Sequence, residues 1–321
     1  MQLRKWLYLL LAVLFAYYLS RHWSDLREVG RVILNGTWYW MLAAALFQVL
    51  HYAFHGTALR ESFASLGIVR RRRDYLKVTM ASLAVNVVAP SMNLSGSAFA
   101  VDETRRKGFP PVSSVVAVAL TTISDGIACI LGAILVAGVL FIREDLSSNM
   151  LLGVLLLTAV VISITSLTIF FWKRPHTLNW LFTLMGKKRS RKWKEEWHRI
   201  TSVALPFKKV WKVLVYEVLQ HFANFFSLIC IFLAFGIDPV SIVPATVYVV
   251  GVIFIILSPT PMGIGFAEGG MVLAMVSQGM PEAQATAVTL AFRGMSFWLP
   301  FLIGTIFLHN INQERPREAT V

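Results

Sequence analysis

The chain has 321 residues, of which 56% are hydrophobic and only 15% are charged, and its formal net charge is +13. This composition excludes an ordinary soluble domain and favours an integral membrane protein. The positive charge does not indicate nucleic-acid binding, because Lys and Arg occur in short segments between apolar stretches rather than on one basic face. Cys129 and Cys230 each lie in an apolar stretch, so neither a disulfide framework nor a zinc knuckle is predicted.

Apolar stretches long enough to cross a bilayer recur along the chain, at about 20 residues for each crossing. The first follows Arg4 and Lys5 and lacks a small-residue cleavage site, so we expect a retained span rather than a removed signal peptide. The predicted fold is an all-α polytopic membrane protein with six full transmembrane helices, at 6–20, 37–59, 111–142, 149–172, 211–236 and 282–309.

Two further apolar regions, 75–104 and 240–278, are interrupted by helix-breaking residues. Proline removes a helical hydrogen bond and glycine permits turn dihedrals, so each region is predicted to form two half-helices around a break. Backbone groups freed at membrane depth must be buried in protein or line a wet cavity. The residues at the two breaks are Asn86, Pro90, Asn93, Ser95 and Gly96 in the first region, and Pro259, Pro261, Gly263 and Gly265 in the second.

These interrupted regions match each other in sequence. Gly108 and Pro110 follow Pro90 at the same spacing at which Gly279 and Pro281 follow Pro261, which predicts an internal repeat offset by 171 residues. Within a single transmembrane domain, 1–321, the first copy is placed at 60–142, a basic cytoplasmic loop at 173–210 and the second copy at 211–309.

The charges that flank the two regions predict their direction of entry. Lys and Arg flank 75–104, whereas 240–278 has neither at its ends, so the regions are expected to be re-entrant hairpins that enter from opposite faces. Such an inverted repeat is typical of alternating-access transporters. The same bias predicts a multi-pass protein of the cell (inner) membrane with cytoplasmic N- and C-termini.

Ionisable residues within spans are costly and usually face an interior or a wet cavity. Asp125 and Arg293 lie in matching helices of the two copies, so an acid and a base could face one cavity, and Glu268 lies in the second hairpin. An alternative is that Glu268 and Arg293 form a structural ion pair that locks hairpin to helix.

Small residues begin the returning half-helix of each hairpin. Gly263 and Gly265 in the second copy, and Ser95 and Gly96 in the first, would place free N–H groups at a helix N-terminus, which attracts anions such as a lipid phosphate. The alternative is that these residues only allow close helix packing.

A basic segment at 187–199 contains Lys187, Lys188 and Arg189, with tryptophans four residues apart. Together with Arg105 and Arg106 it is expected to contact anionic headgroups of the inner leaflet. A solvated loop that only sets the orientation remains the alternative.

Other chemistry is not indicated. His51 and His55 lie four residues apart, but no third ligand is evident, so they are interpreted as ordinary interior histidines and neither a metal nor a cofactor is predicted. No nucleophile elbow, Walker loop or dinucleotide loop is found, so the chain is not expected to be an enzyme.

The run Pro261-Met262-Gly263-Ile264-Gly265-Phe266-Ala267-Glu268 resembles the Pro-Gly-Gly-x-Gly-x-x-Glu signature of the lysylphosphatidylglycerol synthase transmembrane-region family, the flippase-like part of the multiple peptide resistance factors. The segment from Asn86 to Gly96 resembles that family's first motif, and Asp125 and Arg293 fit its following helices. Met262 replaces the usual first Gly, and Thr121-Thr122 replaces the Glu-Arg of many members.

This resemblance implies a lipid flippase or transporter that moves a phospholipid headgroup between leaflets through a cavity between the hairpins. About a dozen residues follow the last span, so lipid aminoacylation by a soluble domain is not expected. The expected partners are membrane lipids, either anionic or aminoacylated phospholipids. A homo-oligomer or an envelope-synthesis protein is a further partner considered. The main alternative function is a non-transporting membrane subunit that binds lipid and organises a cell-envelope or glycolipid synthesis enzyme, and a carrier of ions or small solutes is a third reading.

Overall fold

The computed structural model describes residues 38–69, 71–88, 94–142, 207–239, 241–258 and 260–313, with scattered residues between 155 and 170. These residues form helices and connecting turns, and no strand occurs among them. Four helical stretches are long and apolar enough to cross a membrane: Trp38–Ser65, Pro111–Ile142, Val210–Ala234 and Glu282–Ile311. They match the predicted spans 37–59, 111–142, 211–236 and 282–309; the predicted span 6–20, and almost all of 149–172, lie outside the described residues.

Each interrupted region consists of two helices, as the prolines and glycines predicted. The first break region contains α4 (Arg72–Val88) and α5 (Leu94–Arg106). The second contains α11 (Val243–Leu257), a short 3₁₀ turn (Pro261–Gly263) and α12 (Phe266–Val276). Insertion of these pairs into a membrane as re-entrant hairpins stays a prediction.

Helix lengths recur between the two halves of the chain. Helices α3 (Trp38–Ser65) and α10 (Phe207–Ala234) both have 28 residues, and their residue numbers differ by 169 at both ends. The starts of α4 and α11 differ by 171, and so do the starts of α6 and α13, the offset at which the repeat is predicted. The 32-residue α6 (Pro111–Ile142) then corresponds to a run made of α13 (Glu282–Arg293), the π-helical turn η4 (Gly294–Trp298) and α14 (Leu299–Gln313).

The turn after each break region has the same backbone hydrogen bonds. Gly108 follows α5 with φ 83, and Gly279 follows α12 with φ 89. In both turns the glycine N–H donates to the carbonyl three residues earlier, and the next N–H donates to the carbonyl five residues earlier, at 3.0 to 3.1 Å. This is a Schellman cap, which needs a left-handed residue and therefore favours Gly.

The chain divides into two compact units. Unit 1 comprises Met1–Leu50, Leu83–Ser95 and Phe222–Val321, and unit 2 comprises His51–Ser82 and Gly96–His221. The core of unit 2 is centred on the rings of Phe63, Tyr75 and Phe109, whose centroids lie 4.9 to 6.1 Å apart. Such tilted and edge-to-face aromatic contacts stabilise a core beyond simple burial.

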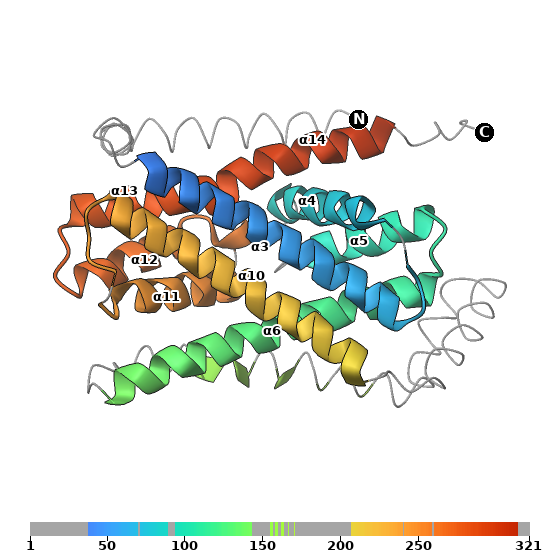
Figure 1. Cartoon of the computed structure of the whole chain (residues 1–321), viewed down its shortest axis with the longest axis horizontal. Coiled ribbons are helices and arrows are strands. Elements are labelled where there is room, and N and C mark those ends of the chain that lie inside the picture. Colours follow the sequence, from blue (N-terminus) through green and yellow to red (C-terminus); the bar gives the residue numbers. More distant parts are fainter. Residues whose placement is uncertain are drawn as a thin grey trace. The chain divides into compact units, whose positions relative to one another are not determined.

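In unit 1, α11, α12 and α13 pack together (Figure 1) around a core that includes Phe232 and Met271. Glycines bring α11 and α12 close. A Cβ built on Gly251 would lie 3.1 Å from Met271 Sδ, and one built on Gly270 would lie 2.5 Å from the ring of Phe254. Small residues at such crossings are typical of helices that pack in membranes.

The surface of α6 carries apolar side chains. Leu131, Ile134, Leu135 and Phe141 are all exposed. A row of exposed large apolar groups is costly in water and marks a surface that contacts lipid or another protein. The chain is therefore a membrane protein with several apolar helices.

Candidate functional site

The side-chain hydroxyls of Ser258 and Thr260 stabilise the break in the second region. Ser258 Oγ and Thr260 Oγ1 lie 2.7 Å apart, and the Thr260 N–H donates to Ser258 Oγ at 3.0 Å. Thr260 Oγ1 in turn donates to the Ile264 carbonyl at 2.9 Å. Side-chain bonds thus replace part of the helical backbone ladder that ends at Leu257.

Three residues of this break have positive φ: Met262 at 52°, Gly263 at 71° and Gly265 at 84°. Met262 is the only residue other than glycine with positive φ in the described part of the chain. Gly263 also lies against α11, where an added Cβ would be 2.8 Å from Ile255 Cα. The family signature has Gly at the position of Met262, and this backbone conformation gives the physical reason for it.

Glu268 joins this break to the start of α12. Its Oε2 accepts a hydrogen bond from the Gly265 N–H at 2.7 Å, which caps the helix at its N3 position. Its Oε1 accepts from Arg293 Nε at 2.7 Å, and the Arg293 side chain is only 3% exposed. Both carboxylate oxygens of Glu268 therefore have partners within the protein.

Arg293 contacts the break itself as well as Glu268. Its Nη2 donates to the Met262 carbonyl at 3.1 Å, and its guanidinium carbon lies 4.6 Å from the centroid of the Phe297 ring. Arg293 is the last residue of α13, directly before the π-helical turn. The ion pair considered as an alternative in the sequence is thus the geometry observed, and we call this contact of Arg293 with Glu268 and the Met262 carbonyl the Arg293 latch.

The first break region has polar contacts of another kind. Ser95 Oγ donates to Asn86 Oδ1 at 3.2 Å and lies 3.4 Å from the Val85 carbonyl. Gly96 lies in the first turn of α5. Pro90 and Asn93, which were predicted to contribute to this site, lie outside the described residues.

The basic residues predicted to contact headgroups are only partly described. Arg105 and Arg106 end α5, and both pair with Asp102, at 3.1 and 2.8 Å. These pairs are largely exposed, so they add little stability. Lys187, Lys188 and Arg189 lie outside the described residues.

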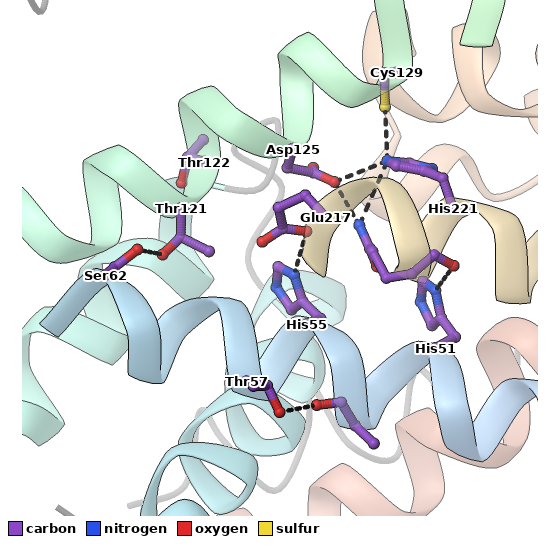
Figure 2. Close-up of polar contacts among 12 residues, drawn as sticks. His51, His55, Thr57, Ser62, Thr121, Thr122, Asp125, Cys129, Glu217 and His221 are labelled. Carbon is purple, nitrogen blue, oxygen red and sulfur yellow. Dashed lines mark hydrogen bonds and ion pairs between the residues drawn. The ribbon is translucent and has the colours of Figure 1, made fainter. Parts of the chain in front are cut away.

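Asp125 belongs to a cluster between α6 and α10 in unit 2 (Figure 2). Its Oδ1 accepts a hydrogen bond from Gln220 Nε2 at 2.6 Å and lies 2.9 Å from His221 Nε2. Cys129 Sγ lies 3.2 Å from the same His221 nitrogen. Asp125 lies in unit 2 and Arg293 in unit 1, and a cavity that both residues face stays a prediction.

Two contacts between α3 and α10 adjoin this cluster. His55 Nδ1 lies 3.1 Å from Oε2 of the fully buried Glu217, and His51 Nδ1 lies 3.1 Å from the Gln220 carbonyl (Figure 2). The two histidines thus have separate partners, and their spacing of four residues does not bring both Nδ1 atoms to one ligand.

The pair His55–Glu217 has a counterpart in unit 1. Gln48 Nε2 donates to Asn224 Oδ1 at 2.8 Å. With the offset of 169 between α3 and α10, Gln48 corresponds to Glu217, and Asn224 corresponds to His55. Equivalent places of the two units therefore hold a neutral amide pair in unit 1 and an ionisable pair in unit 2.

Three residues of this network, Glu217, Gln220 and His221, were not singled out in the sequence. All three lie in the predicted span 211–236, and Glu217 and His221 are four residues apart. The rule that drew attention to Asp125, that ionisable groups within spans have a function or a partner, would have found Glu217 and His221.

A family model for the lysylphosphatidylglycerol synthase TM region matches residues 5–304. The chain is also 31% identical, over 110 residues, to the UPF0104 membrane protein MJ1595 of Methanocaldococcus jannaschii. This second match covers 33% of each chain, so the chain spans about a third of that relative's length. On the family match, the chain belongs to the lysylphosphatidylglycerol synthase transmembrane-region family.

Proposed function

We propose that this member of the lysylphosphatidylglycerol synthase transmembrane-region family is a lipid flippase or lipid transporter, which moves a phospholipid headgroup between leaflets. The observation that carries the proposal is the buried Arg293 guanidinium at the break before α12, where it contacts both Glu268 and the Met262 carbonyl. A charged side chain in an apolar helix is expensive, and such residues usually mark a substrate or ion path.

The chemistry around Arg293 suits an anionic group. Its guanidinium is positive, and the N-terminus of α12 adds the partial positive charge of a helix dipole. A guanidinium can bind either a carboxylate or a phosphate, and here only Arg293 Nε donates to Glu268 while Nη2 donates to the Met262 carbonyl. A lipid phosphate can therefore compete with Glu268 for Arg293.

In the proposed cycle, the headgroup phosphate displaces Glu268 from Arg293 and opens the latch, while the acyl chains stay in the membrane. Re-formation of the ion pair then releases the headgroup. The other residues assigned to the headgroup path are those at the helix ends: Asn86, Pro90, Asn93, Ser95 and Gly96 in the first copy, and Pro261, Gly263 and Gly265 in the second. Anionic and aminoacylated phospholipids are the proposed substrates.

The test is movement of headgroup-labelled lipids across the bilayer of proteoliposomes that contain the full chain. Anionic, zwitterionic and aminoacylated lipids are compared for the native protein and for Arg293→Gln and Glu268→Gln. Arg293→Gln removes the charge that attracts phosphate, and Glu268→Gln leaves Arg293 uncompensated so that release slows. Each is expected to lower the rate about tenfold or more, which corresponds to about 1.4 kcal/mol of lost interaction.

Glu282→Gln is the matched control, because Glu282 is an exposed acid in the first turn of α13. This variant should move lipid at the native rate. Equal rates for the native protein and both latch variants would disprove the site. If folded protein moves none of the lipids, transport itself is wrong, and the subunit that organises an envelope-synthesis enzyme becomes the better explanation.

A further inference from the structure

Three different metal-ligating side chains converge between α6 and α10 in unit 2. Asp125 and Cys129 are four residues apart and therefore share one face of α6, and His221 reaches them from α10 (Figure 2). One ligand atom from each residue lies within 4.8 Å of the other two. The closest separations are 2.9 Å, between His221 Nε2 and Asp125 Oδ1, and 3.2 Å, between His221 Nε2 and Cys129 Sγ.

Hydrogen bonds alone serve this arrangement poorly. A ring nitrogen of a neutral imidazole carries either one proton or one lone pair, so His221 Nε2 can serve the carboxylate and the thiol together only by sharing one proton between them. A metal ion would use the lone pairs of oxygen, nitrogen and sulfur at once. Zinc bonds of about 2.0 to 2.3 Å place tetrahedral ligand atoms about 3.3 to 3.8 Å apart. The two separations from His221 Nε2 need to widen by less than about 1 Å, and the separation of Asp125 from Cys129 is within 4.8 Å.

Charge balance favours the same conclusion. A divalent ion bound by the Asp125 carboxylate and a Cys129 thiolate is neutral overall, which avoids the cost of a net charge in an apolar span. Deprotonated thiolate, neutral imidazole and carboxylate are the ligands that zinc takes in proteins.

The surrounding residues hold the ligands in place. Gln220 Nε2 donates to Asp125 Oδ1 at 2.6 Å, and the Gln220 carbonyl lies 3.1 Å from His51 Nδ1. Glu217, one turn before His221 on α10, is fully buried, and its Oε1 has no hydrogen-bond partner among the described residues. Hydrogen bonds from neighbours to ligand side chains are a general feature of metal sites, and an unsatisfied buried carboxylate oxygen beside them adds local negative potential.

We infer that Asp125, Cys129 and His221 form a binding site for one divalent metal ion of the zinc type. Three protein ligands leave a fourth position for water or for an oxygen of a bound anion. The site does not depend on lipid transport, because it uses residues of unit 2 and makes no use of the Arg293 latch. It also differs from a metal site at His51 and His55, which the sequence analysis considered and did not predict.

The test uses the full chain in detergent micelles, stripped with a chelator and dialysed against Zn²⁺ or Co²⁺. We expect one ion for each chain. Cys129→Ser and His221→Ala should each lower the affinity about 10- to 100-fold or more, the range found when even an outer partner of a ligand is lost. Cys230→Ser is the matched control, because Cys230 is the chain's other buried cysteine and lies on α10 away from the three ligands. The Co²⁺ form should show thiolate-to-cobalt absorption, which Cys129→Ser loses and Cys230→Ser keeps.

A second readout keeps all three ligands in the chain that tests the site. Zn²⁺ should slow alkylation of Cys129 in the Cys230→Ser chain but leave alkylation of Cys230 in the Cys129→Ser chain unchanged. Equal metal binding by native protein and Cys129→Ser would mean an adventitious ion only and would overturn the proposal. Failure of the helical, monodisperse native protein to bind Zn²⁺, with no protection of Cys129, would also overturn it and leave a hydrogen-bonded cluster.

Discussion

The two copies of the repeat share a backbone but differ in the charges placed on it. In the second copy Arg293 and Glu268 form the latch, whereas the positions 171 residues earlier hold Thr122 and Ser97. Thr122 Oγ1 donates to the Val118 carbonyl of its own helix at 3.0 Å. Because both copies form a two-helix break region and the same Schellman turn, one with the ion pair and one without it, these features do not require the latch. Its presence in one copy is better explained by a function.

A second difference lies in the helix that follows each break. Helix α6 continues as a regular α-helix from Pro111 to Ile142, but the equivalent run is interrupted by a π-helical turn at Gly294–Trp298. This turn directly follows Arg293 and brings Phe297 beneath its guanidinium. Such π-helical turns are rare and often lie at functional sites. The second copy is therefore specialised at one point, around Arg293.

The largest expected effect separates Arg293 from its counterpart Thr122. Arg293→Ala leaves Glu268 buried without its charged partner, so the free energy of unfolding should fall by about 3 to 5 kcal/mol. Thr122→Ala should change it by about 0.5 kcal/mol or less, because the hydroxyl only bonds back within its helix. Chemical denaturation in detergent micelles, followed by helix content, measures both.

The double variant Glu268→Gln with Arg293→Met provides the control, because it removes both buried charges. It should recover at least half of the stability that Arg293→Ala loses. If Arg293→Ala and Thr122→Ala lowered the free energy of unfolding equally, the Arg293 latch would add no more stability than the Thr122 hydrogen bond of the first copy.

A smaller effect is expected at the glycines with positive φ. Gly263→Ala combines a left-handed backbone with a Cβ 2.8 Å from Ile255 Cα, so both strain and overpacking apply, and the loss should be about 2 to 4 kcal/mol. Gly279→Ala has the same backbone strain but open space around the Cβ, so it should cost only about 1 to 2 kcal/mol. Thermal unfolding of the two variants in one detergent measures the difference.

Gly108→Ala extends this test to the first copy. Its Cβ also meets nothing within 4 Å, and its φ of 83 matches that of Gly279. Equal losses for Gly108→Ala and Gly279→Ala would support equivalent turns, and a loss at Gly263 no larger than theirs would contradict the close approach of the break to α11.

The local features of this fold could be predicted from the sequence, because each depends on neighbouring residues. Proline and glycine located both breaks, and Gly108 and Gly279, which indicated the repeat, are the residues that form the two Schellman turns. Four predicted spans agree with helices, although α3 continues to Ser65, six residues past its predicted end at 59. The helix continues because apolar and polar residues beyond 59 pack on the core of unit 2, and hydropathy does not detect such packing.

The partners of buried polar residues could not be predicted in the same way. The sequence favoured a ligand site at Glu268 and left the ion pair as an alternative, because nothing local decides whether Arg293, 25 residues later, reaches it. Glu217 finds His55 across 162 residues, and His221 finds Asp125 across 96. Helix periodicity predicts the face of the helix on which each residue lies, but it does not predict which other helix packs against that face.

The third and smaller comparison is between the two pairs that α3 forms with α10, His55–Glu217 in unit 2 and Gln48–Asn224 in unit 1. His55→Asn alone should lower the free energy of unfolding by about 1 to 3 kcal/mol, because it replaces a partner of the fully buried Glu217. His55→Asn with Glu217→Gln recreates the Gln48–Asn224 pair of unit 1 and should regain most of that loss. Denaturant titration of the two variants and of the native protein measures the coupling.

The order of these effects matters. A double variant less stable than His55→Asn would mean that the site in unit 2 cannot hold the amide pair of unit 1, and that the two α3–α10 contacts are not equivalent. Asn224→His with Gln48→Glu is the reciprocal exchange, and it should be the less stable double variant, because it introduces ionisable groups where none lie in the native pair.

The smallest expected effect is a gain of stability at Met262. This residue is left-handed at φ 52, which costs a side-chain-bearing residue about 1 to 2 kcal/mol, whereas glycine adopts the conformation freely. Met262→Gly restores the family signature and should raise the free energy of unfolding by about 0.5 to 1 kcal/mol, after allowance for the greater chain entropy of glycine. The equivalent position of the first copy lies outside the described residues, so the control is made at the same position. Met262→Ala keeps the left-handed strain of the backbone and should give no gain in stability. If Ala and Gly stabilised equally, the effect would come from removing the Met262 side chain, and the Arg293 latch would not be holding a strained carbonyl.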